Sequence, residues 1–201
     1  MTASPHTHKH IPDRLAFMLN NPIRRILSHP DRLISTLEIR PKDVVVDFGC
    51  GPGFFLIPLA GVAAKVMGID VSSRMLDRAS SYAKKSHVSV DLLQSDGTDI
   101  KLQDGSVDLI LLVHVFHEVE DEQRVLREFL RILRPSGRLA IVEKTRPSSV
   151  LPASLGPPIM EEKRVVEEVQ RAGLTFDRTI PYGKDSIIIS RKRPLAGLTN
   201  N

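Results

Sequence analysis

Three glycines at every second position follow an acidic residue in Asp47-Phe48-Gly49-Cys50-Gly51-Pro52-Gly53. Glycine has no Cβ, so this loop can turn sharply and bring its backbone close to a ligand. The valines before Asp47 predict a short strand buried on both faces, and the apolar residues 54–60 predict a helix. A strand, a glycine loop and a helix frame a nucleotide pocket, and the carboxylate of Asp47 suits a ligand that carries a cationic amino group.

The loop differs from two other kinds of nucleotide site. A dinucleotide-binding loop needs a glycine where this chain has Phe54, and a Walker loop ends in Gly-Lys-Ser or Gly-Lys-Thr, which does not occur here. Asp47 would also repel a pyrophosphate. Cys50 is the only cysteine, so no internal disulfide forms and a reducing compartment is expected. We predict that Cys50 packs within the loop and is not a nucleophile.

Acidic residues also follow the next two predicted strands. The strand 65–70 ends in Asp70, and an acid at this place in nucleotide-binding folds accepts hydrogen bonds from a ribose diol. Ser72 or Ser73 is predicted to cap the following helix. After the strand 88–94, Asp96 and Gly97 form a loop, where the acid suits the exocyclic amine of adenine or else simply a turn.

Histidine and glutamate side chains follow the fourth and fifth predicted strands, residues 106–113 and 139–143. His114, His117 and Glu118 come after the fourth strand, and Glu143 ends the fifth. Histidine titrates near neutral pH, so His117 and His114 are the candidate bases for a substrate that must lose a proton. Glu118 and Glu143 are candidate bases or orienting groups.

Each of these side chains has a structural alternative. His114 could close its strand and bond backbone, and Glu143 could pair with Arg146. The same histidines and glutamates could also form a zinc or iron cluster, but His114 and His117 are three residues apart in a strand-to-loop turn, not four apart on a helix. No metal site is predicted.

Strands and helices alternate as far as the fifth strand, which predicts an α/β fold with a parallel, doubly wound sheet. Ligands of such sheets bind beyond the carboxyl ends of the strands, so the acids and histidines are expected along one edge. A helix over 161–172 and two antiparallel strands, 174–180 and 186–190, complete a mostly parallel seven-stranded sheet with an antiparallel final strand.

The 201 residues suffice for one α/β domain with a full core, and are too few for two. We expect a single domain over 13–193, in which helices broken at prolines form an N-terminal cap over 13–40. The Pro- and Ser-rich segment 144–158 suggests a lid or an acceptor-site loop. The tails 1–12 and 194–201 are expected to be disordered or frayed, and the alternating histidines of the first are attributed to a mobile tail, not to a metal site.

Composition limits the partners. The net charge is +4, but the basic residues are scattered and there are two Tyr and no Trp, so a nucleic-acid partner is allowed without being favoured. The longest apolar run, Leu109–Val113, is too short to cross a bilayer, and no secretory signal is visible at the N-terminus. We expect a cytoplasmic protein without a membrane span. The oligomeric state is left open.

The order of these motifs resembles that of the class I S-adenosylmethionine-dependent methyltransferases, whose first motif is an acid followed by Gly-x-Gly-x-Gly. Asp70, Asp96 and the segment Leu133-Arg134-Pro135-Ser136-Gly137-Arg138-Leu139 extend the resemblance, since the family commonly has Leu-Lys-Pro-Gly-Gly-x-Leu there. The resemblance covers residues 40–145 by motif order and 160–192 by topology. Within the family, the chain is similar to the methyltransferases of ubiquinone and menaquinone biosynthesis. This resemblance implies a Rossmann-like methyltransferase fold.

The resemblance also implies the cofactor, S-adenosyl-L-methionine, with S-adenosyl-L-homocysteine as product. In this interpretation Asp47 holds the amino group of the methionine moiety, Asp70 the ribose, and Asp96 with Gly97 the adenine. The whole predicted cofactor set is Asp47, Gly49, Cys50, Gly51, Gly53, Asp70, Val71, Met75, Asp96, Gly97, Thr98 and Val113. The predicted catalytic set is His117, His114, Glu118 and Glu143.

The expected function is methyl transfer to a small-molecule acceptor whose identity is left open. The Asn-Pro-Pro-Tyr signature of enzymes that methylate adenine or glutamine nitrogen is absent, because His114-Val115-Phe116-His117 stands in its place. The paired cysteines of arsenite methyltransferases are absent as well. Two alternatives are an RNA or protein methyltransferase, suggested by the positive net charge, and a non-catalytic module that binds the cofactor.

Overall fold

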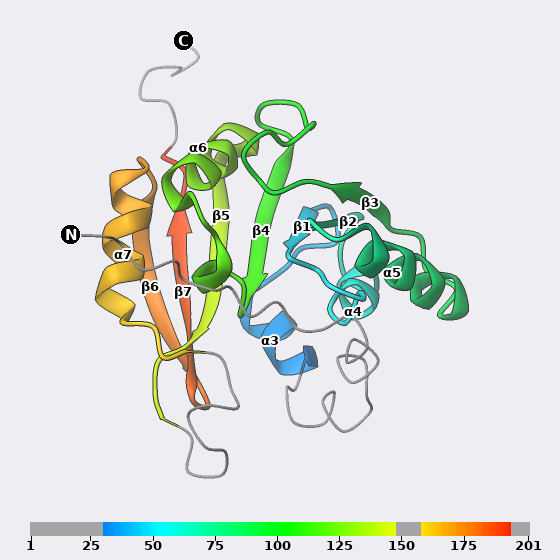
Figure 1. The fold of residues 1–201 in the computed structure, drawn as a ribbon, viewed down its shortest axis with the longest axis horizontal. Helices are drawn as coiled ribbons and strands as arrows, with labels where there is room; N and C mark the ends of the chain where they lie inside the picture. The colour runs from blue at the N-terminus through cyan, green and yellow to red at the C-terminus, as the bar shows by residue number, and fades with distance from the viewer. Residues whose placement is uncertain (1–29, 148–157, 194–201) are drawn as a thin grey trace, which may run out of the picture.

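A seven-stranded sheet with the strand order β3-β2-β1-β4-β5-β7-β6 organises the computed structural model, which describes residues 30–147 and 158–193 (Figure 1). The predictions for the two tails, for cap residues 13–29 and for lid residues 148–157 lie outside the described residues. The histidines near the N-terminus lie outside them too.

Six strands run in the same direction, five of them paired in parallel, and only the last, β7, runs the opposite way. The parallel strands are β1 (Val44–Phe48), β2 (Lys65–Asp70), β3 (Asp91–Gln94), β4 (Val107–Val113) and β5 (Leu133–Lys144). β7 (Asp185–Arg191) lies between β5 and β6 (Thr175–Tyr182) and is antiparallel to both. The predicted fold class, with its antiparallel final strand, is confirmed.

Helices cover both faces of the sheet because successive residues of a strand point to opposite faces. One face packs against α3 (Pro30–Thr36), α4 (Leu56–Ala60) and α5 (Ser73–Lys85). The other packs against α6 (Glu122–Ile132) and α7 (Glu162–Arg171). We call these the α3 face and the α6 face. A short 3-10 helix, η2 (Phe116–Glu118), follows β4.

Several element boundaries differ from the sequence-based ones. β3 begins at Asp91 and not at residue 88, because this edge strand pairs only with β2 and its partners begin at Met67. β5 begins at Leu133, six residues early, and its register against β4 shifts where Ser136 takes a left-handed φ of 64°. The predicted turn at Arg134–Arg138 is therefore an irregular part of the strand. Ser72 caps α5 as predicted, accepting a hydrogen bond from the amide of Met75.

Candidate active site

The glycine loop between β1 and α4 has one side packed against protein and one side open. A Cβ on Gly49 would lie 2.5 Å from Val115 Cγ2, so this glycine is required by packing. Gly51 has a φ of +52°, and a Cβ built there would meet no atom of the described residues within 4 Å. Gly51 therefore faces open space, and any side chain on it would project into that space.

Asp47, the last residue but one of β1, is buried with one oxygen unsatisfied. Its side chain is on the α3 face, since its neighbour in the sheet is Leu111, which packs there. Within the described residues Asp47 Oδ2 has no hydrogen-bond partner. Burial, and then the negative charge of Asp70, raise the pKa of Asp47 to about 8. A cationic group that reached this carboxyl would satisfy the free oxygen and favour the ionised form.

Asp70, at the end of β2, ties the glycine loop to the next loop. Its Oδ2 accepts a hydrogen bond from the Gly51 amide at 2.8 Å, and its Oδ1 accepts one from the Ser72 amide at 2.9 Å. A carboxylate oxygen accepts about two hydrogen bonds, so both oxygens keep capacity for a ligand hydroxyl. The next residue, Val71, is 57% exposed. An apolar surface therefore lies directly beside the carboxylate.

Asp96 and its neighbours shape the loop after β3. Asp96 Oδ1 accepts hydrogen bonds from the amide and the hydroxyl of Thr98, both at 2.9 Å, and these two bonds lower the pKa of Asp96. A Cβ on Gly97 would lie 2.6 Å from Phe48 Cζ. Asp96 Oδ1 therefore stabilises the turn, as the structural alternative for Asp96 predicted. Gly97 allows the loop to pack against the end of β1.

Cys50, Met75 and Val113 complete the predicted cofactor set. Cys50 is buried, and a Cβ on Gly68 would lie 2.8 Å from its Sγ. Burial, and then the charges of Asp47 and Asp70, raise the pKa of its thiol, so the thiolate is disfavoured. Met75 lies in the first turn of α5 and Val113 ends β4, and both are half-buried.

A buried carboxylate orients His117. His117 Nδ1 lies 3.0 Å from Glu143 Oε2 and 3.1 Å from Oε1, and the His117 amide donates to Oε1 at 3.3 Å. Glu143 is fully buried. Burial works against the charged ring, but the hydrogen bond and charge of Glu143, together with the charge of Glu118, outweigh it and raise the pKa of His117. Because Glu143 occupies Nδ1, the other ring nitrogen, Nε2, is the one available for proton transfer.

The remaining predicted catalytic residues are placed differently. Glu118 is exposed, and its Oε1 is 3.9 Å from His117 Nε2. His114 has a left-handed φ of 57°, and its Nε2 lies 3.0 Å from Asp185 Oδ2 in a geometry that makes no hydrogen bond. The suggested pairing of Glu143 with Arg146 is wrong, because Glu143 binds His117 and Arg146 Nη1 donates to the Gly183 carbonyl.

Sequence reasoning did not find Asp185. The predicted antiparallel hairpin could have indicated it, because such a hairpin brings the start of the last strand to the carboxyl end of β5. The two histidines of the predicted catalytic set have different partners: His117 contacts Glu143, with Glu118 farther away, and His114 contacts Asp185, which was not in the set. In the part of the chain that the structure describes, no three His, Cys, Asp or Glu side chains gather as a metal site requires.

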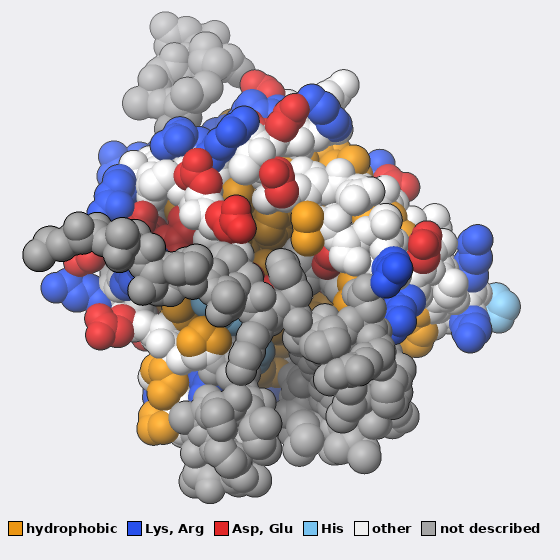
Figure 2. All heavy atoms as spheres, viewed as in Figure 1, with side chains coloured by type: hydrophobic (Ala, Val, Ile, Leu, Met, Phe, Trp, Pro, Cys, Tyr) orange, Lys and Arg blue, Asp and Glu red, His pale blue; other side chains and the backbone are white. Residues whose placement is uncertain are grey.

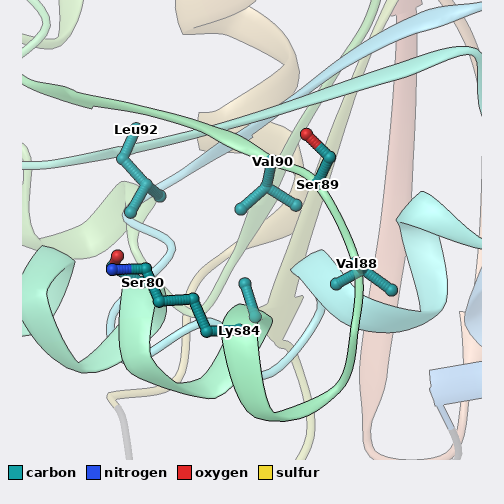
Figure 3. Close-up of a pocket in the computed structure, with 7 residues that line it drawn as sticks. Ser80, Lys84, Val88, Ser89, Val90 and Leu92 are labelled. Atoms are coloured by element: carbon teal, nitrogen blue, oxygen red, sulfur yellow. The ribbon is translucent and has the colours of Figure 1, made fainter.

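A small pocket elsewhere on the surface contains none of these residues. It has a volume of about 210 Å³ and lies between the C-terminal half of α5 and the segment that leads into β3 (Figure 3). Ser80 and Lys84 line it from the helix, and Val88, Ser89 and Val90 line it from the segment. It is at the start of β3, whereas Asp96 follows the end of that strand, so it is separate from the candidate site.

Known proteins match the chain in sequence. Residues 46–141 match the family model described as "Methyltransferase domain". Demethylmenaquinone methyltransferase of Lactobacillus johnsonii is 28% identical over 59% of this chain and 50% of its own length. Ubiquinone biosynthesis O-methyltransferase of Rickettsia akari is 30% identical over 67% of this chain and 49% of its own. The chain thus spans about half the length of these curated relatives.

A solved structure matches the whole fold. The crystal structure of a SAM-dependent methyltransferase from Aquifex aeolicus has a TM-score of 0.82 and 26% sequence identity, and the match covers 91% of this chain and 100% of that one. Residues 46–141 belong to the methyltransferase-domain family, and the chain has the fold of a SAM-dependent methyltransferase. The residues that match the family model include the glycine loop, Asp70 and Asp96.

The site of this methyltransferase fits its family's cofactor on three observations. The unsatisfied Asp47 oxygen suits an ammonium group, the space at Gly51 admits a ligand beside the backbone, and the Asp70 oxygens can accept from ribose hydroxyls. All three lie at the carboxyl ends of β1 and β2.

None of the described helices could span a bilayer, since none combines sufficient length with apolar character.

Proposed function

We propose that this protein transfers a methyl group from S-adenosylmethionine to a small molecule, and that His117 takes the proton that the acceptor loses. The observation that carries the proposal is the His117–Glu143 pair at the carboxyl ends of β4 and β5, the sheet edge that also holds Asp47 and Asp70. The quinone-methylating relatives support an acceptor that is a small molecule with an acidic hydroxyl or carbon.

The cofactor side of the site uses charge and close backbone. Asp47 would hold the α-ammonium group, Asp70 the ribose, and Val71 an apolar face of the adenosine, while Asp96 contacts the adenine through its loop. When bound, S-adenosylmethionine supplies a methyl group on a sulfonium that is already reactive toward nucleophiles. The chain's contribution is therefore to fix the positions of the two reactants.

The acceptor side uses a histidine held in one orientation. Glu143 accepts from Nδ1 and so leaves Nε2 unprotonated in the neutral ring, which makes Nε2 the base. The same carboxylate stabilises the imidazolium that forms once the proton arrives. The raised pKa of His117 makes the ring a stronger base than free histidine, which favours acceptors with weakly acidic hydroxyls.

The charge distribution supports a small molecule over RNA. On the face shown in Figure 2, Lys and Arg side chains lie among Asp and Glu side chains along the upper and left-hand rim. Many arginines are paired with carboxylates, among them Arg131, Arg164 and Arg191. An arginine that is already paired with a carboxylate contributes less to the binding of an RNA phosphate backbone.

The experiment is a methyl-transfer assay with labelled S-adenosylmethionine and a panel of hydroquinones, catechols and hydroxylated aromatic acids. We expect product with at least one compound, at least a hundredfold loss in His117→Ala, and full binding of S-adenosylhomocysteine by that variant. Cofactor binding without transfer to any compound would favour the non-catalytic module. A salt-sensitive RNA gel shift combined with RNA methylation would favour the RNA enzyme.

A further inference from the structure

A polar row crosses the end of the sheet on its α3 face. Asp185 of β7 is directly opposite Lys144 of β5 on one side and Tyr182 of β6 on the other. Paired residues of antiparallel strands point to the same face, so these three side chains are neighbours. His114 joins the row through its 3.0 Å contact with Asp185 Oδ2. We define the polar row as His114, Lys144, Asp185 and Tyr182.

Lys144 is the unusual member. It is only 7% exposed, and within the described residues its Nζ makes neither a hydrogen bond nor an ion pair, even though Asp185 is its cross-strand partner. Most of the Lys144 side chain is buried, while its Nζ is not among the fully buried atoms that lack a partner. An anion that reached this ammonium would form an ion pair partly shielded from water.

His114 has an unmet polar atom as well. Its Nε2 is buried and makes no hydrogen bond within the described residues, and its backbone is held beside β5 by a hydrogen bond from its amide to the Val142 carbonyl at 2.9 Å. The unpaired ammonium of Lys144 and the unsatisfied nitrogen of His114 belong to adjacent strand ends and share Asp185 as a neighbour.

Charges of both signs lie near the row. The guanidinium of Arg32, on α3, lies 5.7 Å from the centre of the Tyr182 ring and acts electrostatically on its hydroxyl, as Asp185 does with opposite sign. Of the charged residues that these contacts name, Lys144 and Arg32 are cationic and Asp185 is anionic. Lys144 is on the same face of the sheet as Asp47. Leu111 of β4 pairs with Asp47 on one side and with Ala140 on the other, so Asp47 and Ala140 point to one face. Every second residue of β5 shares that face, which places Val142 and Lys144 there as well.

We propose that the polar row is an acceptor subsite that receives an anionic oxygen group, with Lys144 as its counter-charge and His114 as a second donor. The proposal rests on the proposed function, since it assigns a substrate class to that same site. Glu143 and Lys144 are consecutive and point to opposite faces, so one strand end supplies the orienting carboxylate on one side and the anion site on the other. The acceptor class is a small molecule that carries a carboxylate or a phosphate besides the atom that is methylated.

The experiment measures binding of three fluorinated probes to protein saturated with S-adenosylhomocysteine, by ligand-observed ¹⁹F NMR. The probes are 4-fluorobenzoate, 4-fluorophenyl phosphate and the neutral isostere 4-fluorobenzamide. We expect at least one anionic probe to bind tenfold or more tightly than the amide. Preference for benzoate would identify a carboxylate, and preference for the phosphate would identify a phosphate.

Variants separate charge from structure. Lys144→Met should remove the preference, Lys144→Arg should retain most of it, and Lys42→Met, at an exposed lysine before β1, should leave it unchanged. Asp185→Asn should strengthen anion binding severalfold, which keeps the test decisive even if Lys144→Met does not fold. Equal affinities for all three probes, or no binding at millimolar concentration, would overturn the subsite. Because binding of S-adenosylhomocysteine is measured first, its failure would instead count against the proposed function.

Discussion

Replacing Asp47 with Asn should stabilise the ligand-free protein while abolishing its response to the cofactor. Burial and the nearby charge of Asp70 raise the pKa of Asp47 to about 8, and one of its oxygens has no partner in the described chain. An unfolded aspartate has a pKa near 4. Ionising Asp47 in the empty site therefore opposes folding, and the amide of Asn removes that cost while nearly keeping the shape of the side chain.

The magnitude and its sign follow from linkage. Between about pH 4 and pH 8 the folded state keeps a proton on Asp47 that the unfolded state has lost, so the free energy of unfolding falls as pH rises. Each pKa unit corresponds to about 1.4 kcal/mol, which gives on the order of 5 kcal/mol over the whole range, as an upper bound. From pH 5.5 to 7.5 the advantage of Asp47→Asn over the wild type should grow by about 2–3 kcal/mol.

The assay is urea unfolding of both proteins at pH 5.5, 6.5 and 7.5, without ligand and with S-adenosylhomocysteine. Comparing the two proteins cancels other titrating groups such as His117. Asp77→Asn, at an exposed carboxylate on α5, is the matched control and should show no growing advantage. A constant difference between wild type and Asp47→Asn across this pH range would refute the reasoning, as would equal stabilisation of both by the ligand.

Three further predictions concern the other parts of the site. Asp70→Ala should weaken binding of S-adenosylhomocysteine by about 1–3 kcal/mol in calorimetry, and unchanged affinity would exclude its ribose role. Gly51→Ala should cost about 1–2 kcal/mol in urea unfolding, because its φ is left-handed, and should reduce ligand affinity at least tenfold; unaltered affinity would mean that the open space is not used. Glu143→Gln should lower the pKa of His117 in an NMR titration, and Glu118→Gln, at an exposed and more distant carboxylate, should lower it less; equal shifts would contradict the orienting role of Glu143.

The sequence was sufficient for the sheet and for placing Asp47, Asp70 and the histidines at the carboxyl ends of its parallel strands. Hydrophobic strand patterns and glycine turns are local signals, so the strands, the glycine loop and the Ser72 cap could be predicted from short windows. Parallel strands end on one edge, which is why Asp47, Asp70 and the histidines were expected together. The start of β5 was missed because Leu133 already pairs with β4 before an irregular segment interrupts the pairing. That segment has no strand pattern in its sequence.

The pairing of side chains at the site could not be predicted. Whether Glu143 meets His117 or Arg146 depends on which face the end of β5 presents and on the 3-10 turn at Phe116–Glu118. The contact of His114 with Asp185 joins residues far apart in sequence and depends on the left-handed backbone at His114 and on the register of β7. Those are properties of the tertiary structure and not of any local pattern.

Isothermal titration of the wild-type protein with S-adenosylhomocysteine at pH 7, in two buffers of different ionisation enthalpy, tests the central claim most directly. If the glycine loop and Asp47 hold the cofactor, binding should occur at micromolar concentration and release close to one proton, since the ammonium group draws Asp47 into its ionised form. Asp47→Asn should release none. The absence of binding at millimolar ligand, or equal proton release from the two proteins, would contradict the account.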